Sequence, residues 1–223
     1  MKILSVETSS KVCGVALAED NKLIKEEILE DENTHSVKLM PLIDKILKET
    51  NTDLDSIDLF ATDKGPGSFT GIRIGIATIK AFIDAKNKKG IGITSLECLA
   101  YNVEGFGTIC SIIDARNDNV YYGIFEKKEN KILNKEQNFS NISDLLENLK
   151  NLGEEIIFIG NGAVVHKEKI KELLKQNARF VKDEKLNKLN ARNVAIAAFN
   201  NKENSGDSNS IVPTYLRKSN AER

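Results

Sequence analysis

The chain has 223 residues, enough for one large domain or two small ones that each bury a core without disulfides or a structural metal. Lys and Arg total 32 against 33 Asp and Glu, so the formal net charge is -1 and a strongly basic nucleic-acid-binding surface is not expected. Apolar runs are far shorter than the roughly 20 residues that span a bilayer, and Glu7 comes too early for a secretory signal. These features predict a cytoplasmic protein that does not bind a membrane.

Hydrophobic periodicity divides the first half of the chain into alternating strands and one-sided helices. The predicted elements are three strands, a helix, a strand, a helix and a strand: 2–7, 12–19, 22–29, 36–49, 57–63, 70–86 and 90–94. Asp20 and Asn21 form a short polar turn, which predicts an antiparallel hairpin between the second and third strands. The later strands follow helices, and helical crossovers join parallel strands, so the sheet is expected to be mixed.

The second half repeats this order after a helix at 96–103 and a glycine-rich turn at 105–107. Its predicted elements are three strands, a helix, a strand and a helix: 108–114, 119–126, 131–139, 143–151, 155–160 and 164–176. A last helix at 191–200 precedes the polar stretch 200–210, which is expected to form a flexible loop.

Two successive β-β-β-α-β-α units predict an α/β fold that resembles the actin-like ATPase and sugar-kinase superfamily (ASKHA, RNase-H-like sheets). Each lobe would hold one mixed sheet, and the second lobe is abbreviated. The expected division is an N-terminal lobe at 1–104 that carries the interface helices, a smaller C-terminal lobe at 105–217, and a tail at 218–223.

Cysteine and histidine are rare. The three cysteines, expected as small buried hydrophobes without metal-ligand spacing, are Cys13, Cys98 and Cys110. The two histidines are His35, expected as a capping or surface residue, and His166, expected on a solvent-facing helix. Leu39 and Ile170 stand four residues after them, so the sequence contains no His-x-x-x-His metal pair. No Gly-x-Ser-x-Gly motif supports a serine hydrolase either.

Carboxylates and hydroxyls gather at two predicted strand ends. The segment 7–10 ends the first strand, where backbone N–H groups and hydroxyls could hold a phosphate; an ordinary polar hairpin turn is the alternative. A second acidic turn ends the corresponding strand of the second half. Paired carboxylates at such ends flank a metal–nucleotide complex in the actin-like superfamily. The candidates for weak ATP–Mg or ADP–Mg binding are Glu7, Thr8, Ser9, Ser10, Asp114 and Arg116.

The segment 65–80 begins with three glycines and a proline in seven residues, which predicts a sharply defined loop followed by a helix capped by Ser68 or Thr70. It lacks the spacing of a phosphate-binding P-loop. Gly71 and Gly75 lie four residues apart, and glycine inside a helix costs about 1 kcal/mol relative to alanine, so we expect them to allow close packing of another helix.

The predicted helix 36–49 has an apolar stripe and is the expected partner of that surface. The two helices could pack only on their own sheet, or leave one face exposed for docking or dimerisation. The candidate interface residues, none of them catalytic or metal-binding, are Leu39, Met40, Ile43, Ile46, Gly71, Ile72, Gly75, Ile76 and Ile79.

Seven segments together carry a resemblance to a known family: 3–9, 35–43, 65–80, 94–100, 113–116, 160–163 and 213–217. In this order they resemble the TsaB family, also called YeaZ, across residues 2–217. The most specific segment is Gly-Pro-Gly-Ser-Phe-Thr-Gly-x-Arg at 65–73, and Glu7 stands where many members have Asp.

The resemblance implies a non-catalytic scaffold or activator subunit in the transfer of threonylcarbamoyl to the adenosine beside the anticodon of tRNA. It implies that the related protein TsaD performs the transfer with a metal held by a His-x-x-x-His motif, and that the ATPase TsaE joins the complex. It also implies a homodimer, a helical surface shared with TsaD, no cofactor required by this chain, and contact with tRNA only through the complex. The alternative is an independent actin-like ATPase or carbamoyl-transfer enzyme with a Mg–nucleotide site between the lobes.

Overall fold

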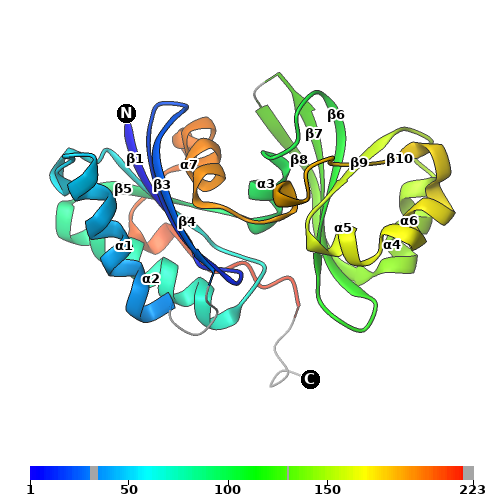
Figure 1. The fold of residues 1–223 in the computed structure, drawn as a ribbon, viewed down its shortest axis with the longest axis horizontal. Coiled ribbons are helices and arrows are strands. Elements are labelled where there is room, and N and C mark those ends of the chain that lie inside the picture. The colour runs from blue at the N-terminus through cyan, green and yellow to red at the C-terminus, as the bar shows by residue number, and fades with distance from the viewer. Residues whose placement is uncertain (31–34, 130, 218–223) are drawn as a thin grey trace. The chain divides into compact units, whose positions relative to one another are not determined.

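The computed structural model describes residues 1–30, 35–129 and 131–217. The expected tail at 218–223 lies outside these residues. The chain forms two compact units, each built on a five-stranded sheet (Figure 1). The first unit comprises Met1–Cys98 and Leu189–Thr214, and the second comprises Leu99–Lys188 with the described residues from Tyr215 onward.

The sheet of the first unit has the strand order β3-β2-β1-β4-β5. Its strands are β1 (Lys2–Glu7), β2 (Val12–Glu19), β3 (Lys22–Glu30), β4 (Leu59–Asp63) and β5 (Lys89–Ile93). The pairs β1–β2 and β2–β3 are antiparallel, whereas β1–β4 and β4–β5 are parallel, which confirms the predicted mixed sheet. All residues of β4 are buried, as expected for a strand covered on both faces.

Helices cover both faces of this sheet (Figure 1). One face packs against α1 (His35–Glu49) and α2 (Phe69–Lys86), and the other packs against α7 (Ala191–Asn200). The short helix α3 (Ser95–Ala100) follows β5, and a 3-10 turn at Leu54–Ser56 leads into β4.

The return of α7 to the first sheet corrects the expected division, which placed all of 105–217 in one lobe. Four buried alanines let α7 approach the sheet closely, and Ser5 Oγ donates a hydrogen bond to Ala191 O at 2.7 Å. The polar stretch 200–210, expected as a flexible loop, is also ordered. It forms 3-10 turns at Lys202–Asn204 and Ser208–Ser210, and Gly206 pairs with Gly90 of β5.

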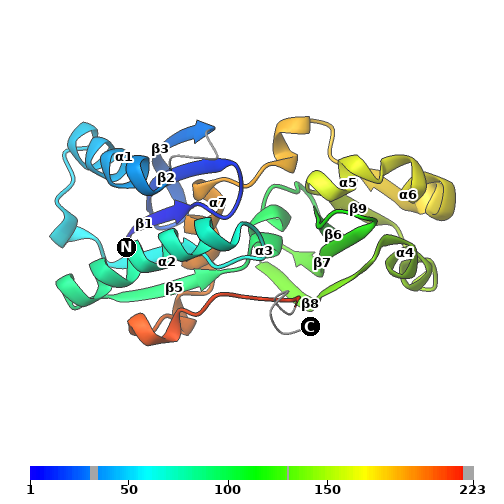
Figure 2. The same ribbon diagram turned by 90° about the horizontal axis from the view of Figure 1, so that it is seen from below.

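The second unit repeats the topology with the strand order β10-β9-β6-β7-β8 (Figure 2). Its strands are β6 (Gly107–Asp114), β7 (Asn119–Lys128), β8 (Lys131–Asn141), β9 (Ile156–Ile159) and β10 (Ala178–Phe180). Its helices are α4 (Ile142–Lys150), α5 (Asn161–Val165) and α6 (Lys167–Leu174), and 3-10 turns lie at Lys175–Asn177 and Glu184–Asn187. The single helix expected at 164–176 is therefore two helices that meet at His166.

The three cysteines are buried and free, as predicted. The two histidines differ from expectation: His35 is 6% exposed and His166 is 8% exposed, so both side chains lie in packed interiors rather than at the surface. Among the helices that the structure describes, none is long and apolar enough to cross a membrane.

Helix α2 packs so closely against the end of β1 that a side chain would not fit at Gly71 or Gly75. A Cβ on Gly71 would overlap the carbonyl oxygen of Thr8, and one on Gly75 would lie 2.5 Å from Thr8 Oγ1 and 2.9 Å from Thr62 Oγ1. The close packing inferred from these glycines is thus real, but their partner is the sheet of their own unit and not another helix.

We therefore expect Gly71→Ala to destabilise the protein by roughly 2–3 kcal/mol, since overpacking against rigid backbone outweighs the better helix propensity of alanine. Urea denaturation measures this change. The matched control is Ala77→Ser on the exposed side of the same helix, which should shift stability by less than about 0.5 kcal/mol. A Gly71→Ala variant that is more stable than the wild type would contradict the close contact.

Candidate functional site

Two buried carboxyl groups lie side by side at the carboxyl ends of neighbouring parallel strands. Glu7 is the last residue of β1 and Asp63 is the last residue of β4, and both are fully buried. Ser9 Oγ bridges them, at 3.0 Å from Glu7 Oε1 and 3.1 Å from Asp63 Oδ2. Ser95 Oγ, at the start of α3, donates to Asp63 Oδ1 at 2.6 Å.

Backbone N–H groups complete the hydrogen bonding of this carboxyl pair. Glu7 Oε1 accepts from the N–H groups of Ser9 at 3.0 Å and Ser10 at 3.1 Å, and Asp63 Oδ1 accepts from Gly65 N at 2.7 Å. Ser68 N donates to Ser9 O at 2.6 Å. The pair thereby fixes the turn after β1 and the glycine-rich loop before α2.

Burial favours the protonated form of the carboxyl pair. Burial raises the pKa of Glu7 well above its ordinary value, and the charge of Asp63 and a hydrogen bond between the two carboxyls raise it further. Burial also raises the pKa of Asp63, against the lowering effect of its hydrogen bonds. The two groups therefore titrate as one coupled pair.

The hydroxyls predicted to hold a phosphate have partners inside the first unit. Thr8 Oγ1 donates to Gly71 O at 2.8 Å, and Ser10 Oγ accepts from Val12 N at 3.1 Å. Because Glu7 and Ser9 are also buried, this segment does not fit the role of an open carboxylate turn for a magnesium-bound nucleotide. Its geometry matches the alternative prediction of a polar hairpin turn.

The second acidic turn follows β6 in the second unit. Asp114 N donates to Asn161 Oδ1 at 3.1 Å, and Asp114 Oδ1 accepts from Arg116 N at 3.1 Å. The side chain of Asp114 is partly exposed, and Arg116 is exposed. Arg116, Asn117 and Asp118 all have left-handed backbone conformations, with φ of 66°, 52° and 56°.

His166 lies against this turn. Its Nε2 is 3.8 Å from Asp114 Oδ1, and its Nδ1 is 3.9 Å from Asp118 Oδ1. Within the described ranges, no group of three or more His, Cys, Asp or Glu side chains has the arrangement of a metal site.

The candidate interface residues lie mostly in the core, which corrects the prediction. The buried members are Leu39, Ile43, Ile46, Gly71, Ile72, Gly75, Ile76 and Ile79. They belong to the inner faces of α1 and α2 that pack on the sheet, because the strongest apolar stripe of an amphipathic helix is the one that faces the core. Met40 is the exception, with 50% of its surface exposed.

Other apolar side chains of α1 and α2 face outward. Val37 is 67% exposed and Phe69 is 51% exposed, and with Met40 they form what we call the outer helical face. The two helices contact each other, and the guanidinium of Arg73 stacks 3.7 Å from the centre of the Phe69 ring. Met40 is among the predicted interface residues, whereas Val37 and Phe69 are not, because they lie off the regular apolar stripe.

The two repeated units define an α/β protein of the actin-like ATPase (ASKHA) fold class. In agreement, the chain is similar to a solved ROK hexokinase from Thermus thermophilus, with a TM-score of 0.58, 8% identity, and coverage of 91% of this chain and 99% of that one. The solved structure of YeaZ from Pseudomonas aeruginosa gives a TM-score of 0.77 at 22% identity, over 96% of this chain and 99% of that chain.

Residues 22–223 match the family model described as "TsaD: tRNA N6-adenosine threonylcarbamoyltransferase". A relative from Bacillus subtilis (strain 168), named tRNA threonylcarbamoyladenosine biosynthesis protein TsaB, is 32% identical over 100% of this chain and 96% of its own length. The chain belongs to the TsaB family. Family membership places it among the proteins of tRNA threonylcarbamoyladenosine biosynthesis.

We expect Glu7→Gln to change how stability depends on pH. The folded state holds its proton more tightly than the unfolded state, so wild-type stability falls as the pH rises from the ordinary pKa of Glu toward the raised one. Glutamine keeps the acceptor oxygen and does not titrate. The difference in unfolding free energy, variant minus wild type, should therefore increase with pH in that window, by up to about 1.4 kcal/mol per pH unit.

Urea denaturation between about pH 5 and pH 8 measures this difference. The control is Glu27→Gln, because the pKa of Glu27 is lowered by Lys45 and the group is ionised throughout that range in both states. For Glu27→Gln, the difference in unfolding free energy from the wild type should stay constant across this pH range. A constant difference for Glu7→Gln as well would show that the carboxyl pair does not retain a proton.

Proposed function

We propose that the chain is a non-catalytic scaffold subunit that holds a TsaD-type transferase in its active conformation, together with a TsaE-type ATPase. The outer helical face carries this proposal. Val37, Met40 and Phe69 expose large apolar side chains on two adjacent helices, and such a cluster is typical of a protein-docking surface. Phe69 and Arg73 also belong to the segment most specific to the TsaB resemblance.

The buried carboxyl pair supports a role without turnover by this chain alone. Glu7 and Asp63 are fully buried and accept hydrogen bonds from their own unit, so neither presents its carboxyl group to a substrate. We infer that the chain needs no cofactor of its own, and that ATP and a metal act on its partners. With a net charge of -1, it would meet tRNA only through the complex.

The same outer helical face would serve a homodimer. A twofold axis through this face would bring the same apolar side chains of two copies together, in an isologous contact. A TsaD-type partner of related fold could then replace one copy. Self-association and binding to the partner would compete, and excess partner would convert homodimers into heterodimers.

Reconstitution tests the proposal. Unmodified tRNA, threonylcarbamoyl-adenylate, a TsaD-type protein and a TsaE-type protein are combined with and without this chain, and the modified nucleoside is measured by chromatography. The modified nucleoside should form only when this chain is present. The chain alone should neither modify tRNA nor hydrolyse ATP. Equal product without it would reject the scaffold role. ATP hydrolysis by the chain alone, lost in Asp114→Ala, would favour the alternative of an independent ATPase.

A Met40→Glu variant should weaken binding to the TsaD-type partner at least tenfold, because the interface would bury an unpaired carboxylate. Titration calorimetry measures the affinity. Met40 is half exposed, so the variant should fold normally. Leu152→Glu is the matched control, since Leu152 is also 50% exposed but lies in the second unit. Similar losses in both variants, or none in Met40→Glu, would show that the outer helical face is not the docking surface.

A further inference from the structure

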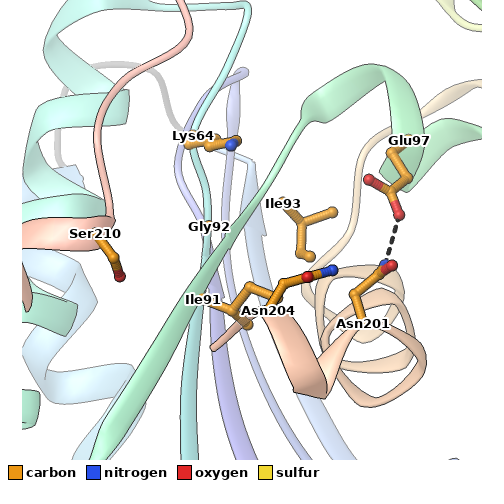
Figure 3. Close-up of a pocket in the computed structure, with 8 residues that line it drawn as sticks. All are labelled: Lys64, Ile91, Gly92, Ile93, Glu97, Asn201, Asn204 and Ser210. Atoms are coloured by element: carbon orange, nitrogen blue, oxygen red, sulfur yellow. Dashed lines mark hydrogen bonds between the residues drawn. The ribbon is translucent and has the colours of Figure 1, made fainter. Parts of the chain in front are cut away.

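A polar pocket lies in the first unit, and neither the carboxyl pair nor the outer helical face lines it. Its volume is about 230 Å³. The pocket is bordered by the end of β4, by β5, by α3 and by the segment that follows α7 (Figure 3). The side chains that could recognise a ligand are Lys64, Glu97, Asn201 and Asn204.

Three of these side chains, those of Lys64, Glu97 and Asn204, hold hydrogen-bonding groups without a partner among the described residues. Among the described residues, nothing forms a hydrogen bond or ion pair with Lys64 Nζ, and the same holds for the carboxamide of Asn204. Glu97 Oε1 accepts from Asn201 Nδ2 at 2.8 Å, which leaves Glu97 Oε2 without a donor in this part of the structure. The pocket therefore offers a cation, an anion and an amide at once.

Local structure holds the two charged groups in place. The aliphatic part of Lys64 lies over Gly92 of β5, where an added Cβ would be 2.9 Å from Lys64 Cδ. Lys64 is also fixed through its backbone, by Lys64 N to Ile93 O at 2.8 Å and by Thr214 N to Lys64 O at 2.8 Å. Glu97 sits in the first turn of α3, where its N–H is capped by Thr94 Oγ1 at 3.2 Å.

We propose that this pocket binds a small zwitterion, an α-amino acid, with its carboxylate on Lys64 and its ammonium on Glu97. The proposal goes beyond the scaffold function and does not depend on it. Lys64 and Glu97 are close enough to interact electrostatically but form no ion pair, so a ligand with both charges can lie between them. The carboxamide of Asn204 would meet a polar group of the same ligand.

The size and the solvation of the pocket favour this class of ligand. Its volume is below the roughly 300–1,000 Å³ of pockets for drug-sized molecules, so a nucleotide would not fit inside. Burial raises the pKa of Glu97, whereas the Asn201 hydrogen bond and the charge of Lys64 lower it. Burial deprives the Glu97 carboxylate of part of its hydration, and a bound ammonium would compensate for that loss. Charge-assisted hydrogen bonds of this kind are stronger than those between neutral groups.

Ligand-observed NMR on the full chain tests the proposal. Each of the twenty common L-amino acids is added separately, and at least one should bind. For the best binder, Lys64→Met and Glu97→Gln should each lower the affinity at least tenfold. Gly92→Ala should lower it at least threefold, because the new methyl group displaces Lys64 without removing its charge. The analogues that lack only the amine or only the carboxylate should bind at least tenfold more weakly.

Lys89→Met and Glu203→Gln are the matched controls, since both residues are exposed and neither lines the pocket. They should leave the affinity unchanged, and thermal unfolding would check that every variant folds. The proposal is overturned if no amino acid binds, if Lys64→Met and Glu97→Gln bind as well as the wild type, or if either single-charge analogue binds equally well. The assay contains no partner protein, so its outcome is independent of the scaffold proposal.

Discussion

The buried hydrogen-bond cluster around Glu7 and Asp63 is the interaction on which the geometry of the first unit depends. Burial of two neighbouring carboxyl groups disfavours their ionisation and raises the pKa of both. The pair accepts hydrogen bonds from the turn after β1, from the loop before α2 and from the start of α3. Three segments that are distant in sequence thus converge on one buried polar cluster.

That convergence also determines where the outer helical face lies. The glycines of α2 bring its first turns against Thr8, and the fixed loop sets where the helix begins. Phe69 then emerges at the start of α2, and Val37 and Met40 emerge from α1, which contacts the same helix. The packing of α2 against the buried polar cluster therefore also sets the position of the outer helical face. Of these two features, only the outer helical face is exposed to a partner.

The sequence predicted the strands and helices with strong periodicity, because burial on one or two faces leaves a pattern in the residues. It did not predict β10, since a strand of three residues has no period, nor the break between α5 and α6 at His166. The 200–210 stretch was misjudged because its order comes from a bridge to Gly90 rather than from its own composition.

The candidate site was harder to predict for a related reason. A helical stripe identifies an apolar face but does not say whether the sheet or a partner covers it, so core residues were taken for interface residues. Similarly, Glu7 was identified as a carboxylate at a strand end, while its partner Asp63 was overlooked. The signal for Asp63 is present in the sequence, because this acid ends an apolar strand two residues before the Gly-Pro-Gly loop.

The discontinuous first unit has a consequence for synthesis of the chain. Helix α7 covers one face of the first sheet, but the ribosome adds it after most of the second unit. Until then that face of the nascent sheet lacks its covering helix, whereas α1 and α2 are already available to pack on the other face. Most of the second unit lies in the segment from Leu99 to Lys188, which is synthesised before α7. A chain that stops before α7 would therefore leave one face of the first sheet uncovered, and exposed apolar surface of this kind promotes aggregation.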